Sequence, residues 1–157
     1  MKSSRKRRQK PPAPITAFWD TSGIVPLCVR QPQSAPARQT ARVHSRQVVW
    51  WSTAVEAVSA FHRLTREGLL TREELRQALA RLEYLRVRWN EVQPTEDLRH
   101  RAERLLATQR FRAADALQLA AALVWCGNHT RGRVFIGADG NLADAAEAEG
   151  FTVIRLL

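Results

Sequence analysis

The sequence predicts one α/β domain built on a five-stranded parallel sheet. The chain has 157 residues, which is the size of a single domain with a single core. Five short runs of apolar, β-branched and aromatic residues are typical of strands, and amphipathic segments with helical spacing lie between them. Short apolar strands joined by helical crossovers favour a parallel sheet with helices on both faces.

The first 14 residues, MKSSRKRRQKPPAP, are basic and then rich in proline. They are predicted to form a disordered leader, 1–14, ahead of the folded domain at 15–157. The leader holds six of the 25 basic residues, so it supplies much of the net charge of +10. A basic run of this kind binds nucleic acid through its charge, or it simply keeps a disordered terminus in solution, and both interpretations stay open.

The N-terminal part of the domain begins with a strand at 15–19 (ITAFW), followed by DTS, which is a helix-start signal. A short helix over 21–28 is expected, limited by the glycine and the proline within it. Residues 29–46 are polar, contain two prolines and carry four arginines, at Arg30, Arg38, Arg42 and Arg46. They are predicted to form a loop or a small positively charged flap.

The middle of the chain contains two strands and two helices. Residues 47–51 (QVVWW) form the second strand, and apolar residues at helical spacing predict a helix over 53–67. Residues 71–86 begin with TREE, a capping-box pattern, and continue with leucines at helical spacing. Residues 88–93 are a weak strand.

The C-terminal part repeats the alternation of helix and strand. A helix starts at Thr95, and a second helix, rich in alanine and leucine, covers 112–126. A strand at 133–137, a helix at 140–149 and a last strand at 151–156 follow. Right-handed crossovers leave few topologies for such a chain.

Four acidic residues lie where this sheet would bring them to one edge. Asp20 directly follows the first strand, Asp139 closely follows the fourth, and Glu56 lies at the start of the helix after the second. Asp115 lies in the first turn of the helix that leads into the fourth strand. Ligands of open parallel sheets bind beyond the carboxyl ends of the strands, so we expect the four carboxylates to converge there.

Each acid also has a purely structural interpretation. Asp20 and Asp139 are candidate helix N-caps, a role that contributes about 1 kcal/mol each. Asp115 is either a first-turn acid favoured by the helix dipole or a partner for Arg112. Glu56 has no helical ion-pair partner ahead of it, although the serine and threonine before it allow a reciprocal cap; its apolar neighbours indicate partial burial.

A divalent cation would explain all four acids together. Carboxylates gathered at one edge repel one another and raise each other's pKa values, and a cation removes that cost. Mg²⁺ and Mn²⁺ prefer carboxylate and water oxygens, and substrate phosphate often completes their shell. An acidic cluster without histidine or cysteine therefore suits a metal-assisted attack on a phosphodiester. The flap arginines are candidates for holding a polyanionic substrate near the acids, although a solvated loop is the more ordinary interpretation.

The composition argues against a membrane protein, a secreted protein and a cysteine-based zinc or disulfide framework. No segment approaches the roughly 18 unbroken apolar residues of a membrane span, and the basic N-terminus is not followed by the apolar run of a secretory signal. Cys28 and Cys126 lie 98 residues apart without a C-x-x-C pair, so neither a zinc site nor a disulfide framework is indicated. We therefore expect a cytoplasmic protein that does not contact a membrane.

Four sequence motifs together resemble the PIN-domain nucleases, and among them the VapC-type toxins of bacterial toxin–antitoxin pairs. The motifs are FWDTSG at 18–23, STAVEAVSAFHR at 52–63, RAADALQLAAAL at 112–123 and GADGNLADAAEAEGFTVI at 137–154. The resemblance covers about residues 15–157. It implies a three-layer α/β/α fold, a Mg²⁺- or Mn²⁺-dependent endoribonuclease that leaves a 5′-phosphate and a 3′-hydroxyl, and inhibition by a cognate antitoxin. It also makes a homodimer plausible.

The resemblance assigns roles residue by residue. Asp20, Glu56, Asp115 and Asp139 match the family's metal-binding and catalytic acids. The residues implied as accessory are Thr21, Ser22, Gln118, Asn141 and Asp144. The flap over 29–46 and the basic leader are additions to the family pattern, so the flap arginines and Arg112 are candidates for binding substrate through their charge alone.

Two positions depart from the family pattern. Gly137 stands where the family often has Ser or Thr, so a polar contact to the site is expected to be absent. Gln118 stands where a His is common; it still donates a hydrogen bond but does not titrate.

Three rival functions remain open. The chain is alternatively a non-catalytic nucleic-acid-binding module, in which binding falls with salt but does not depend on Mg²⁺. A PIN nuclease of RNA maturation is the second rival, and growth arrest on expression would separate it from a toxin. A nucleotide-binding α/β protein is the third, and it is disfavoured because the sequence has no Gly-rich phosphate loop.

Overall fold

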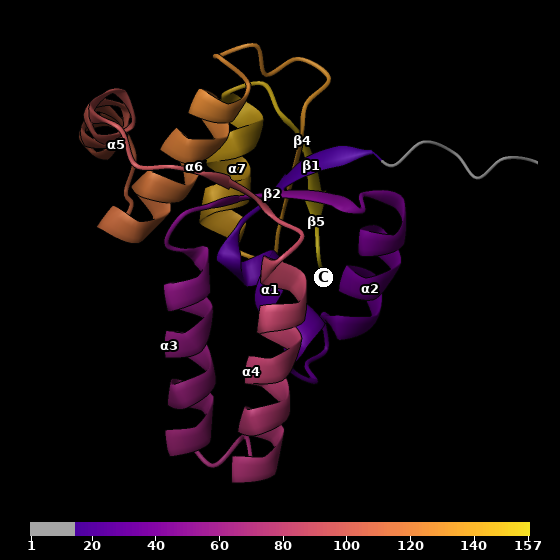
Figure 1. Ribbon diagram of the computed structural model, residues 1–157. Helices are drawn as coiled ribbons and strands as arrows, with labels where there is room; N and C mark the ends of the chain where they lie inside the picture. Colours follow the sequence, from indigo (N-terminus) through magenta and orange to yellow (C-terminus); the bar gives the residue numbers. More distant parts are fainter. Residues whose placement is uncertain (1–14) are drawn as a thin grey trace, which may run out of the picture.

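The structure is a computed structural model that describes residues 15–157. This part of the chain forms five strands and seven helices (Figure 1). The strands are β1 (Thr16–Trp19), β2 (Arg46–Trp50), β3 (Asn90–Val92), β4 (Val134–Gly137) and β5 (Thr152–Arg155). The helices are α1 (Thr21–Cys28), α2 (Ser34–Val43), α3 (Thr53–Arg66), α4 (Arg72–Arg86), α5 (Glu96–Thr108), α6 (Ala113–Trp125) and α7 (Gly140–Ala148). The predicted leader lies outside the described residues.

All five strands are parallel, in the order β3-β2-β1-β4-β5. The central strand β1 pairs with β2 on one side, where Phe18 lies opposite Val48, and with β4 on the other, where Phe18 lies opposite Phe135. The order of the strands reverses at β1, and crevices at such switch points are where open α/β sheets bind ligands.

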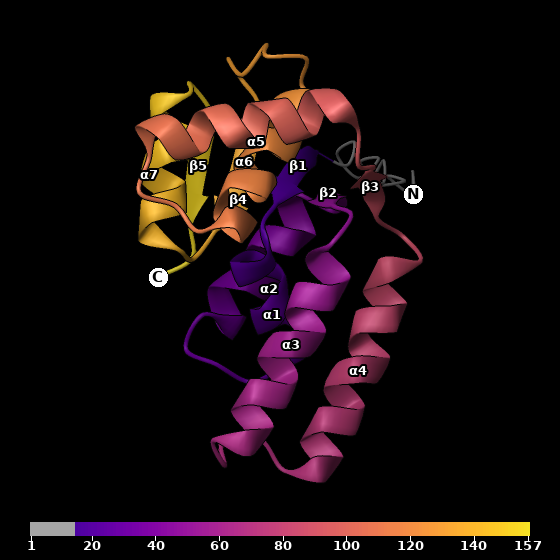
Figure 2. The ribbon, with the colours of Figure 1, turned by 90° about the vertical axis from the view of Figure 1, so that its left-hand side faces the viewer.

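Helices cover both faces of the sheet, so the predicted α/β architecture is confirmed. The alternation of side chains along β1 divides the core: Phe18 faces α5, α6 and α7, whereas Ala17 and Trp19 face α1 to α4. All three of these side chains are fully buried. Figures 1 and 2 show α3 and α4 lying side by side as a hairpin that extends well beyond the sheet.

Local capping explains where several helices begin. The predicted capping box of α4 is present: the Glu74 amide donates to Thr71 Oγ1 at 3.1 Å, and the Thr71 amide donates to Glu74 Oε2 at 2.8 Å. Thr95 caps α5 by accepting from the Leu98 amide at 3.2 Å. The remaining predicted helices and strands agree with the structure to within two residues at each end.

The prediction of a loop or flap over residues 29–46 is wrong, because α2 occupies Ser34–Val43. Pro36 is the third residue of this helix, within the first turn, where a missing N–H removes no intrahelical hydrogen bond. Ala37 is fully buried against the α1 side of the core and holds the helix in place. Pro36 therefore lies at the start of a helix, and the arginines within that helix lie on its solvent-exposed face. Likewise, α1 continues through Pro26 to Cys28.

The structure also bears on membrane-spanning segments and on the two cysteines. Within residues 15–157, no helix is long and apolar enough to span a bilayer. Cys28 and Cys126 are both buried and unpaired. The cysteines therefore serve as packing residues in this fold.

A candidate active site at the carboxyl edge of the sheet

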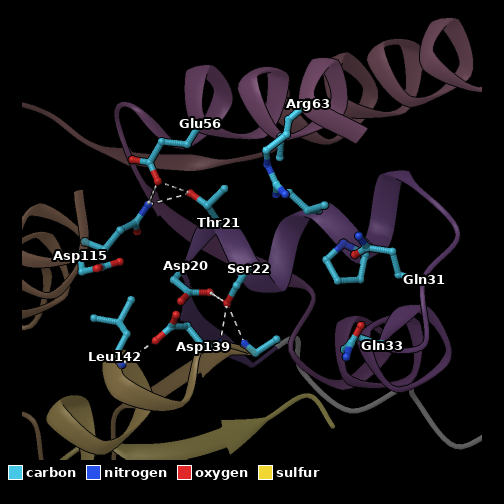
Figure 3. Close-up of a pocket in the computed structure, with 15 residues that line it drawn as sticks. Asp20, Thr21, Ser22, Gln31, Gln33, Glu56, Arg63, Asp115, Asp139 and Leu142 are labelled. Atoms are coloured by element: carbon cyan, nitrogen blue, oxygen red, sulfur yellow. Dashed lines mark hydrogen bonds between the residues drawn. The ribbon is translucent and has the colours of Figure 1, made fainter. Parts of the chain in front are cut away.

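The four acids singled out from the sequence line one cavity of about 430 Å³. Asp20 and Asp139 come from the carboxyl ends of β1 and β4, Glu56 from the first turn of α3, and Asp115 from the first turn of α6. Figure 3 shows their carboxylates gathered on one side of the cavity. The parallel sheet thus brings side chains that lie far apart in the sequence to one edge.

Asp20 is the most deeply placed of the four, with only 2 % of its surface exposed. It caps α1: its Oδ1 accepts from the Gly23 amide at 3.0 Å and from Ser22 Oγ at 2.7 Å. Burial penalises the charged carboxylate, and the nearby charges of Asp139 and Glu56 add to that penalty, so the pKa of Asp20 rises from 3.8 to about 7. The two hydrogen bonds offset only part of this rise.

Ser22 joins the two strand ends that carry Asp20 and Asp139. Its hydroxyl donates to Asp20 Oδ1 and accepts from the amides of Ala138 at 2.7 Å and Asp139 at 3.1 Å. Asp139 in turn caps α7 by accepting from the Leu142 amide at 2.9 Å. The two aspartates are helix N-caps, as the structural interpretation expected, and their placement in the cavity comes in addition to that role.

Glu56 is held by donors on both of its carboxylate oxygens. Ser52 Oγ donates to Oε1 at 2.6 Å, and Thr21 Oγ1 donates to Oε2 at 2.8 Å. The reciprocal cap expected from the preceding serine does not form, because the Ser52 hydroxyl makes no cap hydrogen bond and binds the carboxylate instead. The Glu56 carboxylate is therefore fixed in orientation by the protein alone.

Gln118 connects α6 to this arrangement. It is 2 % exposed, and its Nε2 lies 2.8 Å from Thr21 Oγ1, 3.2 Å from Thr53 Oγ1 and 3.2 Å from Glu56 Oε2. The opposite amide orientation would place a carbonyl oxygen against the Glu56 carboxylate, so the nitrogen must face it. Gln118 Oε1 is buried without a hydrogen-bond partner among the described residues. The Gln118 side chain therefore orients Thr21 and Glu56 through its amide nitrogen.

Asp115 is the least constrained of the four acids. Its Oδ2 accepts from the backbone amide of Arg112 at 3.3 Å, which fits a first-turn acid at a helix N-terminus. Among the ion pairs of residues 15–157, the Arg112 guanidinium makes none with Asp115. The carboxylate therefore remains available to the cavity that it lines.

The oxygen donors of this cavity fit a hard divalent cation. No group of three or more His, Cys, Asp or Glu side chains within 15–157 is close enough to hold a metal as a complete set of protein ligands. Mg²⁺ rarely uses such a set, since it usually binds one or two carboxylates and keeps several waters. Asp20 and Asp139, both tied to Ser22, form the pair best placed for this. Burial raises the pKa of Asp20 to about 7, so a cation bound here would compete with a proton.

Two residues that the family resemblance implied as accessory lie elsewhere. Asn141 and Asp144 line a separate cavity between the end of α5 and α7. Asp144 Oδ1 accepts from Arg155 at 2.7 Å, so its charge is already paired at the surface. Thr21, Ser22 and Gln118, in contrast, all line the acidic cavity.

The arginines predicted to bind substrate do not line the acidic cavity. Arg30 and Arg38 line a different cavity beside α4, together with Arg81. The other three predicted arginines are exposed and lie outside the acidic cavity: Arg42, Arg46 and Arg112.

Sequence reasoning missed Arg63, Gln31 and Gln33, which do line the acidic cavity. Helical spacing gave a signal for Arg63, because it follows Glu56 by seven residues and so falls on the same face of α3. No comparable signal marked the two glutamines, which precede α2 in a segment with no regular pattern.

Comparison with known proteins supports the fold. No family model matches the chain, and no curated protein matches it either. The crystal structure of PAE2754 from Pyrobaculum aerophilum superposes with a TM-score of 0.58 and 17 % sequence identity, over 88 % of this chain and 89 % of that chain. At this identity the match shows the fold alone, which is PIN-like. The resemblance drawn from the four motifs is therefore confirmed at the level of fold.

Proposed function

We propose that this PIN-like chain is a Mg²⁺- or Mn²⁺-dependent endoribonuclease. The observation that carries the proposal is the convergence of four carboxylates, from four different elements, on one cavity at the carboxyl edge of the sheet. Asp20 is the one buried acid of the four, and its burial beside two other carboxylates raises its pKa to about 7. A divalent cation would offset the cost of this burial and would attract an anionic substrate to the cavity.

The carboxylates divide into two groups by their surroundings. Asp20 and Asp139, the pair tied to Ser22, would hold one metal ion together with water ligands, while Asp115 and Glu56 would bind or orient a second ion or its waters. A bound divalent ion supplies a water of lowered pKa and stabilises charge on the reacting phosphate. Asp20 must lose its proton before it can bind a cation.

The remaining residues of the site position these acids. Ser22 keeps Asp139 beside Asp20, and Thr21 and Gln118 keep Glu56 pointed at the same space. The hydroxyls of Ser22 and Thr21 are already used in holding Asp20 and Glu56, so a water bound to the metal is the attacking group in this proposal. Attack by water does not require the 2′-hydroxyl, and the expected products carry a 5′-phosphate and a 3′-hydroxyl.

The first experiment is cleavage of total cellular RNA by the purified protein. We expect cutting with Mg²⁺ or Mn²⁺, none with EDTA, and none by Asp20→Asn or Asp115→Asn variants that remain folded by circular dichroism. The Asp144→Asn variant is a matched control, because its carboxylate lies outside the cavity. Binding of RNA without cleavage under every condition would reject the proposal in favour of a nucleic-acid-binding module. Equal cleavage by all variants would reject the assignment of the active site to these acids.

We further propose that the ribonuclease is the toxin of a VapC-type toxin–antitoxin pair. The support is the ordered set of four motifs together with the PIN-like fold. Induced expression should arrest growth of the host cell, and co-expression of the gene product encoded beside it should relieve the arrest. Expression without any effect on growth, by a protein that cleaves RNA in vitro, would assign the chain to RNA maturation instead.

A further inference from the structure

The cavity has a second end that differs in character from the end that holds the carboxylates. Arg63, Gln31 and Gln33 line it, and Figure 3 shows them on the side away from Asp20 and Asp139. A guanidinium repels cations, and the two glutamine side chains carry no charge, so this end of the cavity is not built like a cation site. They match a part of the substrate that carries a phosphate and a polar base edge.

Arg63 is placed along α3 in line with Glu56. Arg63 follows Glu56 by seven positions, which is about 10 Å along the helix axis on nearly the same face. Ala60, which lies between them and also lines the cavity, is too small to block the path. The guanidinium of Arg63 makes one ion pair in the described part of the chain, 3.6 Å from Glu67, and both side chains are about half exposed, so this pair is weak.

The positive charge of Arg63 would offset the repulsion between the four carboxylates and the phosphates of a nucleic-acid strand. A nucleic-acid strand that enters the cavity meets four carboxylates, and metal ions there offset the repulsion only near the phosphate that they contact. Among the described residues that line the cavity, Arg63 is the one cation. A guanidinium binds phosphate through two parallel hydrogen bonds, so it suits the next phosphate along the backbone.

Gln31 and Gln33 belong to a short segment that the fold holds in a fixed shape. The buried Ser34 hydroxyl accepts a hydrogen bond from the backbone N–H of Gln31 at 2.8 Å and donates one to the backbone carbonyl of Val29 at 2.8 Å. Within residues 15–157, the side-chain amides of Gln31 and Gln33 take part in no hydrogen bond of their own. Each amide offers both donors and an acceptor, which is the pattern that reads base edges.

We propose that this end of the cavity is a nucleotide subsite adjacent to the scissile phosphate. Arg63 binds the next backbone phosphate, and the base between the two phosphates packs on the buried Val25 and Pro26 with its edge toward Gln31 and Gln33. The cavity volume of about 430 Å³ falls within the range of roughly 300–1,000 Å³ typical of small-molecule sites. The subsite rests on the proposed function, because the acids define where the scissile phosphate lies.

Direct binding tests the subsite without any cleavage. The probe is a short fluorescent single-stranded oligoribonucleotide, titrated against the full chain in EDTA and followed by anisotropy. Arg63→Ala should weaken binding about tenfold, as expected for a lost charge-assisted contact. Arg63→Lys should recover part of the loss. Arg66→Ala removes an exposed arginine of the same helix that does not line the cavity. Equal losses in Arg63→Ala and Arg66→Ala would overturn the subsite.

Cleavage locates the contact on the substrate. An oligonucleotide that the protein cuts at one bond is synthesised with single neutral methylphosphonate linkages on either side of that bond. One adjacent neutral linkage should slow the wild-type protein about tenfold and have little further effect on Arg63→Ala. Losses that simply multiply in the variant would reject the contact.

The outcomes also separate this inference from the proposed function. Cleavage by Arg63→Ala with unchanged kcat and KM would reject the subsite and leave the ribonuclease intact. Arg63-dependent binding without cleavage in Mg²⁺ or Mn²⁺ would retain the phosphate contact and reject the ribonuclease.

For the base contact, Gln31→Ala and Gln33→Ala should reduce the spread of kcat/KM among substrates that differ only in the adjacent base. An unchanged spread in both variants would reject it.

Discussion

The carboxylate of Asp20 occupies the space that a side chain at Gly137 would need. A Cβ atom built on Gly137 would lie 2.6 Å from Asp20 Oδ1 and 2.7 Å from Oδ2, closer than real Cβ contacts. The glycine is therefore a requirement of the site as it stands, because it makes room for the buried acid at the junction of β1 and β4.

Gly137→Ala should lower activity more than it lowers stability. The added methyl group must push Asp20 or β4 aside, at a cost of about 1–3 kcal/mol in overpacking. A displacement of the acid of about 1 Å is enough to reduce kcat about 100-fold. Gly140→Ala is the matched control, since nothing lies within 4 Å of its added Cβ. Full activity of Gly137→Ala would show that the position of Asp20 tolerates change.

Asp20→Asn should stabilise the metal-free protein in a pH-dependent way. The folded-state pKa of about 7 exceeds the unfolded value of 3.8, so between these values the folded state holds a proton that the unfolded chain has released. The free energy of unfolding of the wild type therefore falls as pH rises from about 4 to about 7, and the loss persists above pH 7. The advantage of the variant should be small at pH 4 and reach a few kcal/mol at pH 8, measured by urea unfolding in EDTA.

Mg²⁺ should reverse this difference. A cation that binds only the folded state stabilises it by mass action, and it competes with the proton on Asp20. At pH 8 the melting temperature of the wild type should rise with Mg²⁺ concentration, whereas that of Asp20→Asn should change little. The effect on the wild type should weaken below pH 7, where Asp20 keeps its proton. Equal shifts for both proteins would remove Asp20 from the metal site.

Ser22→Ala should loosen Asp139 from Asp20. The amides of Ala138 and Asp139 lose their acceptor, which costs about 1–3 kcal/mol when such groups are left unpaired. Activity should fall, with a higher Mg²⁺ concentration needed for half-maximal rate. Ser59→Ala, at an exposed position on α3, should change stability by no more than about 0.5 kcal/mol and leave the Mg²⁺ dependence alone.

Gln118 is a positioning residue, and its replacements should separate hydrogen bonding from packing. Gln118→Leu keeps the volume but leaves Thr21 and Glu56 without their shared donor, so kcat should fall about tenfold or more with KM nearly unchanged. Gln118→His restores an N–H donor and should recover much of the rate, with a new dependence on pH. A His variant as slow as the Leu variant would assign Gln118 a role in packing alone.

Much of the fold could be predicted from the sequence because its signals are local. Apolar runs marked the strands, and the TREE pattern marked the start of α4 at Thr71. The segment over 29–46 misled prediction, because Pro36 suits a first helical turn as well as a loop. What decided between the two was the burial of Ala37, a tertiary contact that no local pattern reveals.

The candidate site was predictable in outline for a similar reason. Acids that follow parallel strands must meet at one edge, so the convergence of Asp20 and Asp139 followed from topology. The supporting contacts depend on distances across the fold: Gln118 reaches Glu56 from 62 residues away. Gly137 looked like a missing polar contact in the sequence, whereas its role concerns the space around Asp20.

The link from Ser22 to Asp139 spans 117 residues of chain. Domains begin to fold while the ribosome is still adding residues, at about 5–20 residues per second. A nascent chain that has not yet delivered β4 and Asp139 lacks one wall of the cavity and the central pairing of β1 with β4. The order of the strands thus delays the assembly of the four acids at one edge until β4 and Asp139 have left the exit tunnel, long after β1 and Asp20 have been made.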